Sequence, residues 1–233
     1  MENLTQNDEF VVQESSAPSK MQRRSFLKYA GAGAAAAGML VASACKKHHD
    51  DNNTVDVGSG DIGVLNYAYA LEQLEAAFYT QVVATPYSGM SPAELTAFTE
   101  IRDHEVLHRE FLKAALGVNA IPALGVNFGS INFADRASVL AAAKAFEDTG
   151  VSAYNGAGYI ISNSTYLGLA GKIVSVEARH AAFIRDLINY NSFADSSVIV
   201  DSSTGLDTSR KPSQVLPIVA VYLTTNLTAN QLP

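Results

Sequence analysis

The sequence has very little cysteine: Cys45 is the only one among 233 residues, and tryptophan is absent. A single cysteine cannot form a disulfide within the chain. The lack of any Cys-x-x-Cys pair argues against a closed thiolate site for zinc or an iron–sulfur cluster, and against a rubredoxin-like electron donor.

Positive charge is also scarce. The chain has 16 Lys and Arg against 23 Asp and Glu, which gives a net charge of −7. Residues 1–44 hold four residues of each sign, so their removal leaves the net charge unchanged. An acidic domain is a poor nucleic-acid binder, and we expect no nucleic-acid partner. The length and the 48% apolar content indicate one soluble globular domain with tails.

The N-terminus has no confident membrane span. Residues 29–44 are uncharged and rich in Ala and Gly, but they are shorter than the roughly 20 apolar residues that a membrane helix needs. They follow Gln22-Arg-Arg-Ser-Phe-Leu-Lys28, a twin-arginine pattern. We therefore predict that residues 1–44 are a twin-arginine signal segment, which places the protein outside the bacterial cytoplasm, in the periplasm or cell envelope.

The cysteine follows a pattern that is typical of processing. Residues 42–44 satisfy the small-x-small rule for cleavage before Cys45. We expect Cys45 to be lipid-modified and to be the only contact with a membrane. Ala42 stands where lipoprotein signals usually have Leu or Val, so ordinary secretion stays open. Residues 45–60 are predicted to be a solvated linker.

One chemical pattern occurs twice in the remaining chain. Glu-x6-Tyr spans residues 72–79 and Glu-x-x-His spans residues 105–108; both recur about 75 residues later, at 147–154 and 177–180. Positions three, four and seven apart share a helix face. Each acidic residue then lies on an otherwise apolar stripe, as Glu105 does between Ile101 and Leu112.

Buried carboxylates need positive charge between them. Four carboxylates and two imidazoles that converge from four helices form the ligand set of a two-metal carboxylate site. Oxygen and imidazole ligands suit two iron or two manganese ions. The predicted ligands are Glu72, Glu105, His108, Glu147, Glu177 and His180.

Four stretches resemble the ferritin-like superfamily, and within it the exported branch that includes desiccation-related proteins: LEQLEAAFYT, DHEVLHREFLKAAL, AFEDTGVSAYNGAGYI and IVSVEARHAAFIRDL. The resemblance implies an all-α, ferritin-like four-helix bundle and places the family's metal ligands at the six residues given above. Tyr79 resembles a tyrosine one turn from the metals in such proteins, whereas Glu75 matches no required ligand. We expect auxiliary roles around the ligands for Glu75, Tyr79, Tyr154 and His104, the last as a hydrogen-bond partner of a ligand carboxylate.

The bundle is expected over residues 61–190. Its helices should span about 61–83, 91–117, 135–158 and 164–189, with a long crossover between the second and third. Ser91 and Glu94 form a predicted capping box. Residues 191–233 are expected to pack on the bundle as an extension that contains a short strand at 198–200 and a short helix at 215–223.

Three functions are compatible with this sequence. The first is an oxidoreductase of the ferroxidase or peroxidase type that uses peroxide or oxygen at the two metals, in response to oxidative stress. The second is a non-catalytic stress protein of the envelope. A remote third is a zinc metalloprotease, because residues 104–108 spell His-Glu-x-x-His. That motif would explain neither Glu177-x-x-His180 nor the two isolated Glu stripes. A metal-free bundle with internally paired polar residues also remains compatible with the sequence. The sequence assigns neither a catalytic residue nor an oligomeric state.

Overall fold

The computed structural model describes residues 53–233 except 195, 197–198 and 202. The predicted signal segment, Cys45 and most of the predicted linker lie outside the described residues. Four long helices form the bundle: α2 (Gly60–Ala84), α3 (Pro92–Leu116), α4 (Arg136–Ala157) and α5 (Ser164–Ile188). The predicted all-α bundle is confirmed, and every predicted helix is present.

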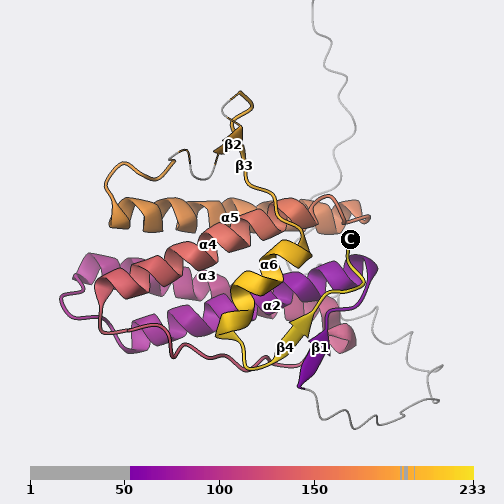
Figure 1. Cartoon of the computed structure of the whole chain (residues 1–233), viewed down its shortest axis with the longest axis horizontal. Coiled ribbons are helices and arrows are strands. Elements are labelled where there is room, and N and C mark those ends of the chain that lie inside the picture. Colours follow the sequence, from indigo (N-terminus) through magenta and orange to yellow (C-terminus); the bar gives the residue numbers. More distant parts are fainter. Residues whose placement is uncertain (1–52, 195, 197–198, 202) are drawn as a thin grey trace, which may run out of the picture. The chain divides into compact units, whose positions relative to one another are not determined.

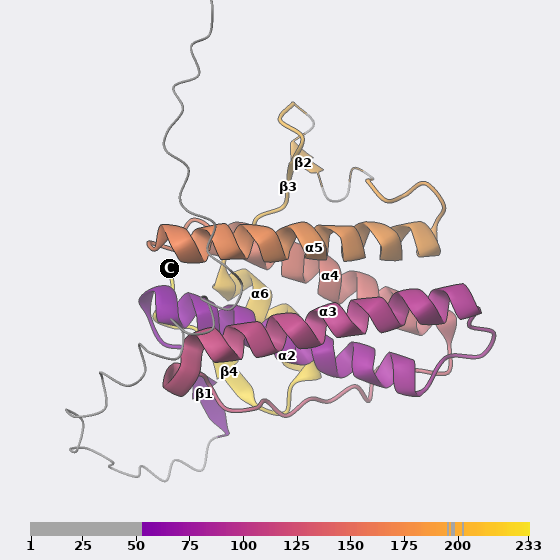
Figure 2. The ribbon, with the colours of Figure 1, turned by 180° about the vertical axis from the view of Figure 1, so that it is seen from behind.

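The helices pack as two hairpins. In Figures 1 and 2, α2 lies beside α3, and α4 lies beside α5. A long connection between α3 and α4 begins with the short 3-10 helix η1 (Gly117–Asn119) and runs along the outside of the bundle to the start of α4. This is the predicted crossover, and it places the ends of α3 and α4 at the same end of the bundle.

Polar side chains fix where the helices begin. Ser91 accepts a hydrogen bond from the Glu94 backbone, and the Glu94 side chain accepts one from the Ser91 backbone, which completes the predicted capping box. Asp135 caps α4 by accepting from the Ser138 backbone, and Asn163 caps α5. These bonds satisfy backbone N–H groups that a helix start leaves free.

The C-terminal extension packs on α4. It contains the antiparallel strands β2 (Ile199–Asp201) and β3 (Leu206–Asp207), then α6 (Pro212–Val219), the 3-10 helix η2 (Ala220–Tyr222) and β4 (Asn226–Thr228). Val215 and Val219 of α6 are buried in the bundle core. Strand β2 lies where a strand was predicted, whereas the predicted helix begins earlier, at Pro212, and turns into a 3-10 helix after Val219.

The end of the predicted linker is part of the folded domain, which corrects the predicted boundary at residue 60. Strand β1 (Thr54–Asp56) pairs in parallel with β4, and Val57 is only 1% exposed. Asp56 accepts a hydrogen bond from the Thr228 hydroxyl. The partner of this short strand lies about 170 residues away in the sequence, so no local pattern could indicate the pairing.

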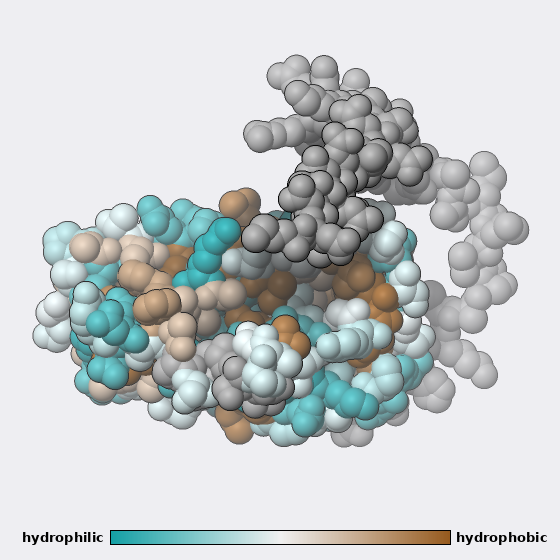
Figure 3. All heavy atoms as spheres, turned by 90° about the horizontal axis from the view of Figure 1, so that it is seen from above, coloured by the Kyte–Doolittle hydropathy of each residue, from teal (hydrophilic) through white to brown (hydrophobic). Residues whose placement is uncertain are grey.

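Aromatic side chains fill much of the core. The ring centroid of Phe78 lies 5.0 Å from those of both Tyr79 and Phe146, in edge-to-face contacts. On the face seen in Figure 3, hydrophobic residues are interrupted by hydrophilic ones. Within the part of the chain that the structure describes, none of the helices combines the length and the apolar character required to cross a bilayer.

Candidate metal centre

The six predicted ligands meet in the middle of the bundle. Glu72 comes from α2 and Glu147 from α4, while α3 and α5 each contribute one Glu-x-x-His pair. The four glutamates are at most 1% exposed and His180 is 5% exposed, whereas the side chain of His108 is 14% exposed. Helix periodicity turns these residues inward because each lies on the stripe that packs against the other helices.

Their ligand atoms fall into two overlapping groups. One contains Glu72, Glu105, His108 and Glu177; the other contains Glu105, Glu147, Glu177 and His180. Within each group, one ligand atom per residue can be chosen so that all lie within 4.8 Å of one another. Glu105 and Glu177 belong to both groups, so the two groups form one continuous site.

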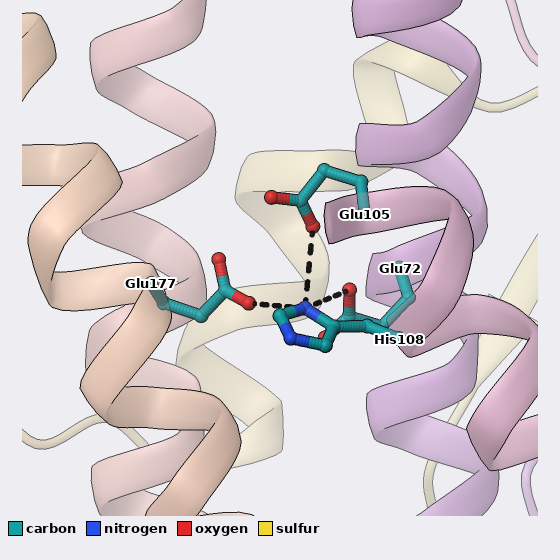
Figure 4. A group of neighbouring side chains, drawn as sticks. All are labelled: Glu72, Glu105, His108 and Glu177. Atoms are coloured by element: carbon teal, nitrogen blue, oxygen red, sulfur yellow. Dashed lines mark ion pairs between the residues drawn. The ribbon is translucent and has the colours of Figure 1, made fainter. Parts of the chain in front are cut away.

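The distances from the histidine nitrogens show that the two oxygens of each shared carboxylate point to different histidines. His108 Nδ1 lies 2.7 Å from Glu177 Oε1 and 3.8 Å from Glu105 Oε2, as well as 3.5 Å from Glu72 Oε2 (Figure 4). His180 Nδ1 lies 2.8 Å from Glu105 Oε1 and 3.3 Å from Glu177 Oε2. Each shared carboxylate therefore directs one oxygen toward each histidine.

Most of these short contacts between histidine nitrogens and glutamate oxygens do not have the geometry of a hydrogen bond. His108 Nδ1, Glu177 Oε1, Glu72 Oε2, Glu147 Oε2 and both oxygens of Glu105 are buried without a hydrogen-bond partner. Buried polar atoms without partners are uncommon and cost free energy, and these six surround the same small volume. Cations in that volume would satisfy all of them, and the oxygen and imidazole donors suit iron or manganese.

The electrostatics of the site are those of crowded negative charge. Burial, followed by repulsion from Glu177, raises the pKa of Glu72 well above its usual value. Burial also raises the pKa of Glu147, to about 8. Burial acts on Glu105 in the same direction, but its contacts with His108 and His180 outweigh burial and lower its pKa to about 2.

The two histidines carry the compensating positive charge when protons are the only cations available. Burial acts to lower their pKa values, yet the surrounding glutamates raise the pKa of both His108 and His180 to about 12. Metal ions would replace these protons, because an imidazole must be deprotonated before it can bind a metal.

Two tyrosines orient Glu72 and Glu147, the two glutamates that are not part of a Glu-x-x-His pair. Each tyrosine bonds the glutamate of the other helix. The Tyr154 hydroxyl of α4 donates to Glu72 Oε1 at 2.5 Å, and the Tyr79 hydroxyl of α2 donates to Glu147 Oε1 at 2.5 Å. The other oxygen of each carboxylate, Oε2, is the one that lacks a hydrogen-bond partner. The tyrosines thus orient each carboxylate and leave one oxygen to face the centre.

His104 lies outside both groups and at the surface. Its Nδ1 is 2.9 Å from His180 Nε2, and the two rings stack with centroids 5.2 Å apart. The prediction that His104 bonds a ligand carboxylate is therefore wrong. Its partner is the ligand imidazole of His180, whose Nδ1 faces the carboxylates and whose Nε2 bonds His104. Since His104 does not join His108 in either group, the structure does not assemble a zinc site of the His-Glu-x-x-His type.

Glu75 lies beside the centre without joining either group. Its residue is 3% exposed, and burial, followed by repulsion from Glu105 and Glu147, raises its pKa well above the usual value. Gly150 holds the corresponding position on α4, and a Cβ added there would lie 3.0 Å from Glu75 Oε1. The missing side chain of Gly150 therefore makes room for the Glu75 carboxylate.

Arg185 is a supporting residue that sequence reasoning missed. It is 3% exposed and donates hydrogen bonds of 3.0 and 2.5 Å to Asp148, the neighbour of Glu147 in the sequence. This pair ties α5 to α4 close to the ligands. The only available signal was an acidic residue directly after a predicted ligand, which by itself indicates no partner.

Comparisons with known proteins bear on the family of the domain and on the N-terminal signal. A family model described as a ferritin-like domain matches residues 60–190, which is more than half of the chain. A model of the twin-arginine translocation pathway signal sequence matches residues 20–39 and supports export across the membrane. A search of curated proteins finds no match.

Proposed function

The chain belongs to the ferritin-like domain family, and we propose that it is an exported protein that holds two iron or two manganese ions between its four long helices. One ion would be bound by Glu72 and His108, the other by Glu147 and His180. Glu105 and Glu177 would bridge the two ions. Bridging fits the observed division of oxygens, since each of these carboxylates directs one oxygen to each histidine.

A single observation supports this assignment most strongly: the unpaired, buried oxygens and the His108 nitrogen all face one another in the bundle core. A metal-free bundle with internally paired polar residues would align these atoms in hydrogen bonds, because leaving several of them unpaired is costly. The absence of that alignment favours metal binding over the metal-free alternative.

We further propose an oxidoreductase function with dioxygen or peroxide as the oxidant. Bound iron or manganese would supply changes of oxidation state. Tyr79, Tyr154 and His104 orient the ligands through hydrogen bonds. The burial of the four glutamates and of His180 excludes bulk water from most of the site. The second candidate is a non-catalytic stress protein of the envelope that binds the same ions without turning over an oxidant.

Turnover separates these two candidates. The protein, loaded with iron or with manganese, is supplied with peroxide or dioxygen and an electron donor, and oxidant consumption is followed. We expect repeated turnover by the wild type and none by Glu177→Ala. The matched control is Glu110→Ala, an exposed glutamate on α3, which should behave as the wild type does. A protein that binds two ions but consumes no oxidant would establish the non-catalytic alternative.

Membrane attachment is proposed only through a lipid on Cys45, which lies outside the described residues. Mass spectrometry of the mature protein from its native host tests this. A diacylated or triacylated N-terminal Cys45 is the expected species. An unmodified N-terminus near Cys45 would show ordinary secretion instead.

A further inference from the structure

The two halves of the metal centre are built from matching contacts. The first half contains Glu72 and His108, and the second half contains Glu147 and His180. In each half, a tyrosine donates a hydrogen bond of 2.5 Å to the glutamate. In each half, the histidine Nδ1 also lies 2.7 or 2.8 Å from a shared carboxylate of the opposite Glu-x-x-His helix. These contacts by themselves give the two halves no reason to bind their ions differently.

The outer nitrogens of the two histidines do differ. His180 Nε2 lies 2.9 Å from Nδ1 of His104, and the two rings are stacked with an angle of 12° between their planes. The outer nitrogen of His108 points away from the three carboxylates in Figure 4 and forms no hydrogen bond with any residue that the structure describes. The side chain of His108 is 14% exposed, compared with 5% for His180. One histidine therefore has a protein partner behind it, and the other faces solvent.

The duplication of the sequence shows where this difference comes from. Glu105 and Glu177 correspond to each other, and the residues directly before them are His104 and Val176. Valine has no hydrogen-bonding atom in its side chain, so the first half lacks the partner that His104 gives to the second. Glu75 also has no counterpart, but it joins neither ligand group, whereas His104 bonds a ligand directly.

A hydrogen bond to its outer nitrogen makes a histidine a better metal ligand. When Nδ1 of His180 faces a metal ion, the proton of the neutral ring is on Nε2, and this N–H can donate to Nδ1 of His104. Such a bond fixes the tautomer and the orientation of the ring and raises the basicity of the ligand nitrogen. The loss of such a partner typically costs about 10- to 100-fold in metal affinity.

We propose that His104 is a positioning residue that makes the second half bind its ion more tightly than the first half, so that the two ions bind in order. The inference rests on the proposed function and adds which ion is retained and which one exchanges. The ion beside Glu147 and His180 should bind about 10- to 100-fold more tightly. The ion beside Glu72 and His108 is then the first to be lost when the metal supply falls.

Anomalous scattering from manganese tests the order of binding. The metal-free mature protein is given one manganese ion per chain and crystallised, and the occupancy of each half is refined. Native mass spectrometry counts the ions per chain in the same solution. We expect the wild type to hold its ion mainly in the second half and most chains to carry a single ion. Equal occupancy of the two halves in the wild type would overturn the proposal.

Exchange of the two corresponding residues provides the decisive variants. His104→Val gives both halves a valine and should equalise their occupancy, while two ions still bind at saturating supply. His104→Val combined with Val176→His moves the histidine to the first half and should reverse the order, which a merely structural role of His104 would not do. The matched control is Glu110→Val at an exposed position of α3, which should keep the wild-type order. The wild-type order in the exchanged variant would rule out the role of His104.

A third variant covers a failure of His104→Val to fold. Val176→His alone gives both histidines a partner and should equalise the occupancy from the other side, because Val176 is only partly buried and its position gives access to the surface. A persistent preference for the second half in this variant would contradict the proposal. Failure of the proposed function gives a different result, namely no bound manganese even at saturating supply. Two ions that bind without order would leave the proposed centre intact and remove only the inference about His104.

Discussion

In Glu72 and in Glu147, one carboxylate oxygen accepts a hydrogen bond from a tyrosine and the other faces the metal centre. The sequence predicts that these glutamates and their Glu-x-x-His counterparts face inward, because helix periodicity alone fixes the face of each residue. It does not predict which tyrosine bonds which glutamate, since the partners lie 68 and 82 residues apart. The imidazole partner of His104 lies 76 residues away and was missed for the same reason.

His104 and His108 should respond differently to the same substitution. His104→Gln removes a hydrogen bond to His180 from outside the centre, and such contacts typically tune metal affinity by about 10- to 100-fold. His108→Gln removes a nitrogen that faces the centre itself. Metal content at micromolar supply should persist in His104→Gln and fall in His108→Gln. Equal loss from both, together with cleavage of casein by the wild type, would favour the zinc protease.

Glu75→Gln should leave at least one metal ion bound. Burial raises the pKa of Glu75 well above its usual value, which favours the neutral form of its carboxyl group, and glutamine has nearly the same shape as that neutral form. Metal content and the thermal midpoint of the variant, compared with those of the wild type, provide the check. Loss of both ions would identify Glu75 as a bridging ligand.

At the scale of elements, the helix ends were predictable and the short strands largely were not. The capping pattern at Ser91 to Glu94 is local and appears in the structure as predicted. Strand β1 takes its hydrogen bonds from β4 at the other end of the domain, so its existence depends on the tertiary fold.

Glu94 should make the bundle sensitive to acid. Burial opposes its ionisation, but hydrogen bonds from Ser91 and Arg136 outweigh this and lower the pKa of Glu94 to about 2. Because the pKa of Glu94 is lower in the folded state, its ionised carboxylate stabilises the fold at pH values above the ordinary pKa of about 4.5. This stabilisation is lost as the pH falls toward 2. The free energy of unfolding, measured with urea, should therefore fall less between pH 7 and pH 3 in Glu94→Gln than in the wild type. Equal losses in both proteins would contradict the role assigned to this carboxylate.

Gly156 should not tolerate alanine. A Cβ at this position would lie 1.9 Å from the carbonyl oxygen of Arg210, where the C-terminal extension crosses α4. We expect Gly156→Ala to lower the free energy of unfolding by about 1–3 kcal/mol, measured by chemical denaturation. The control is Gly171→Ala on α5, where a Cβ would meet nothing within 4 Å, and which should stabilise the protein by up to about 1 kcal/mol. A Gly156→Ala protein as stable as the wild type would show that the extension packs more loosely.

In the part of the chain that the structure describes, the bundle consists of two helical hairpins, α2 with α3 and α4 with α5, which together enclose one centre. The sequence predicts the bundle and the crossover because the duplication repeats a strong helical pattern. The asymmetry between the hairpins comes from single residues, with His104 opposed to Val176 and Glu75 opposed to Gly150. Metal ions that bind only the folded bundle should add to its stability.

The most direct test of the metal centre is the metal content of the mature protein purified from its native host, read by elemental analysis alongside the thermal midpoint with and without a chelator. We expect about two iron or manganese ions per chain, one for each of the two ligand groups, and a midpoint that falls when the ions are removed. Protein that contains no metal and melts at the same temperature with and without chelator would contradict the account.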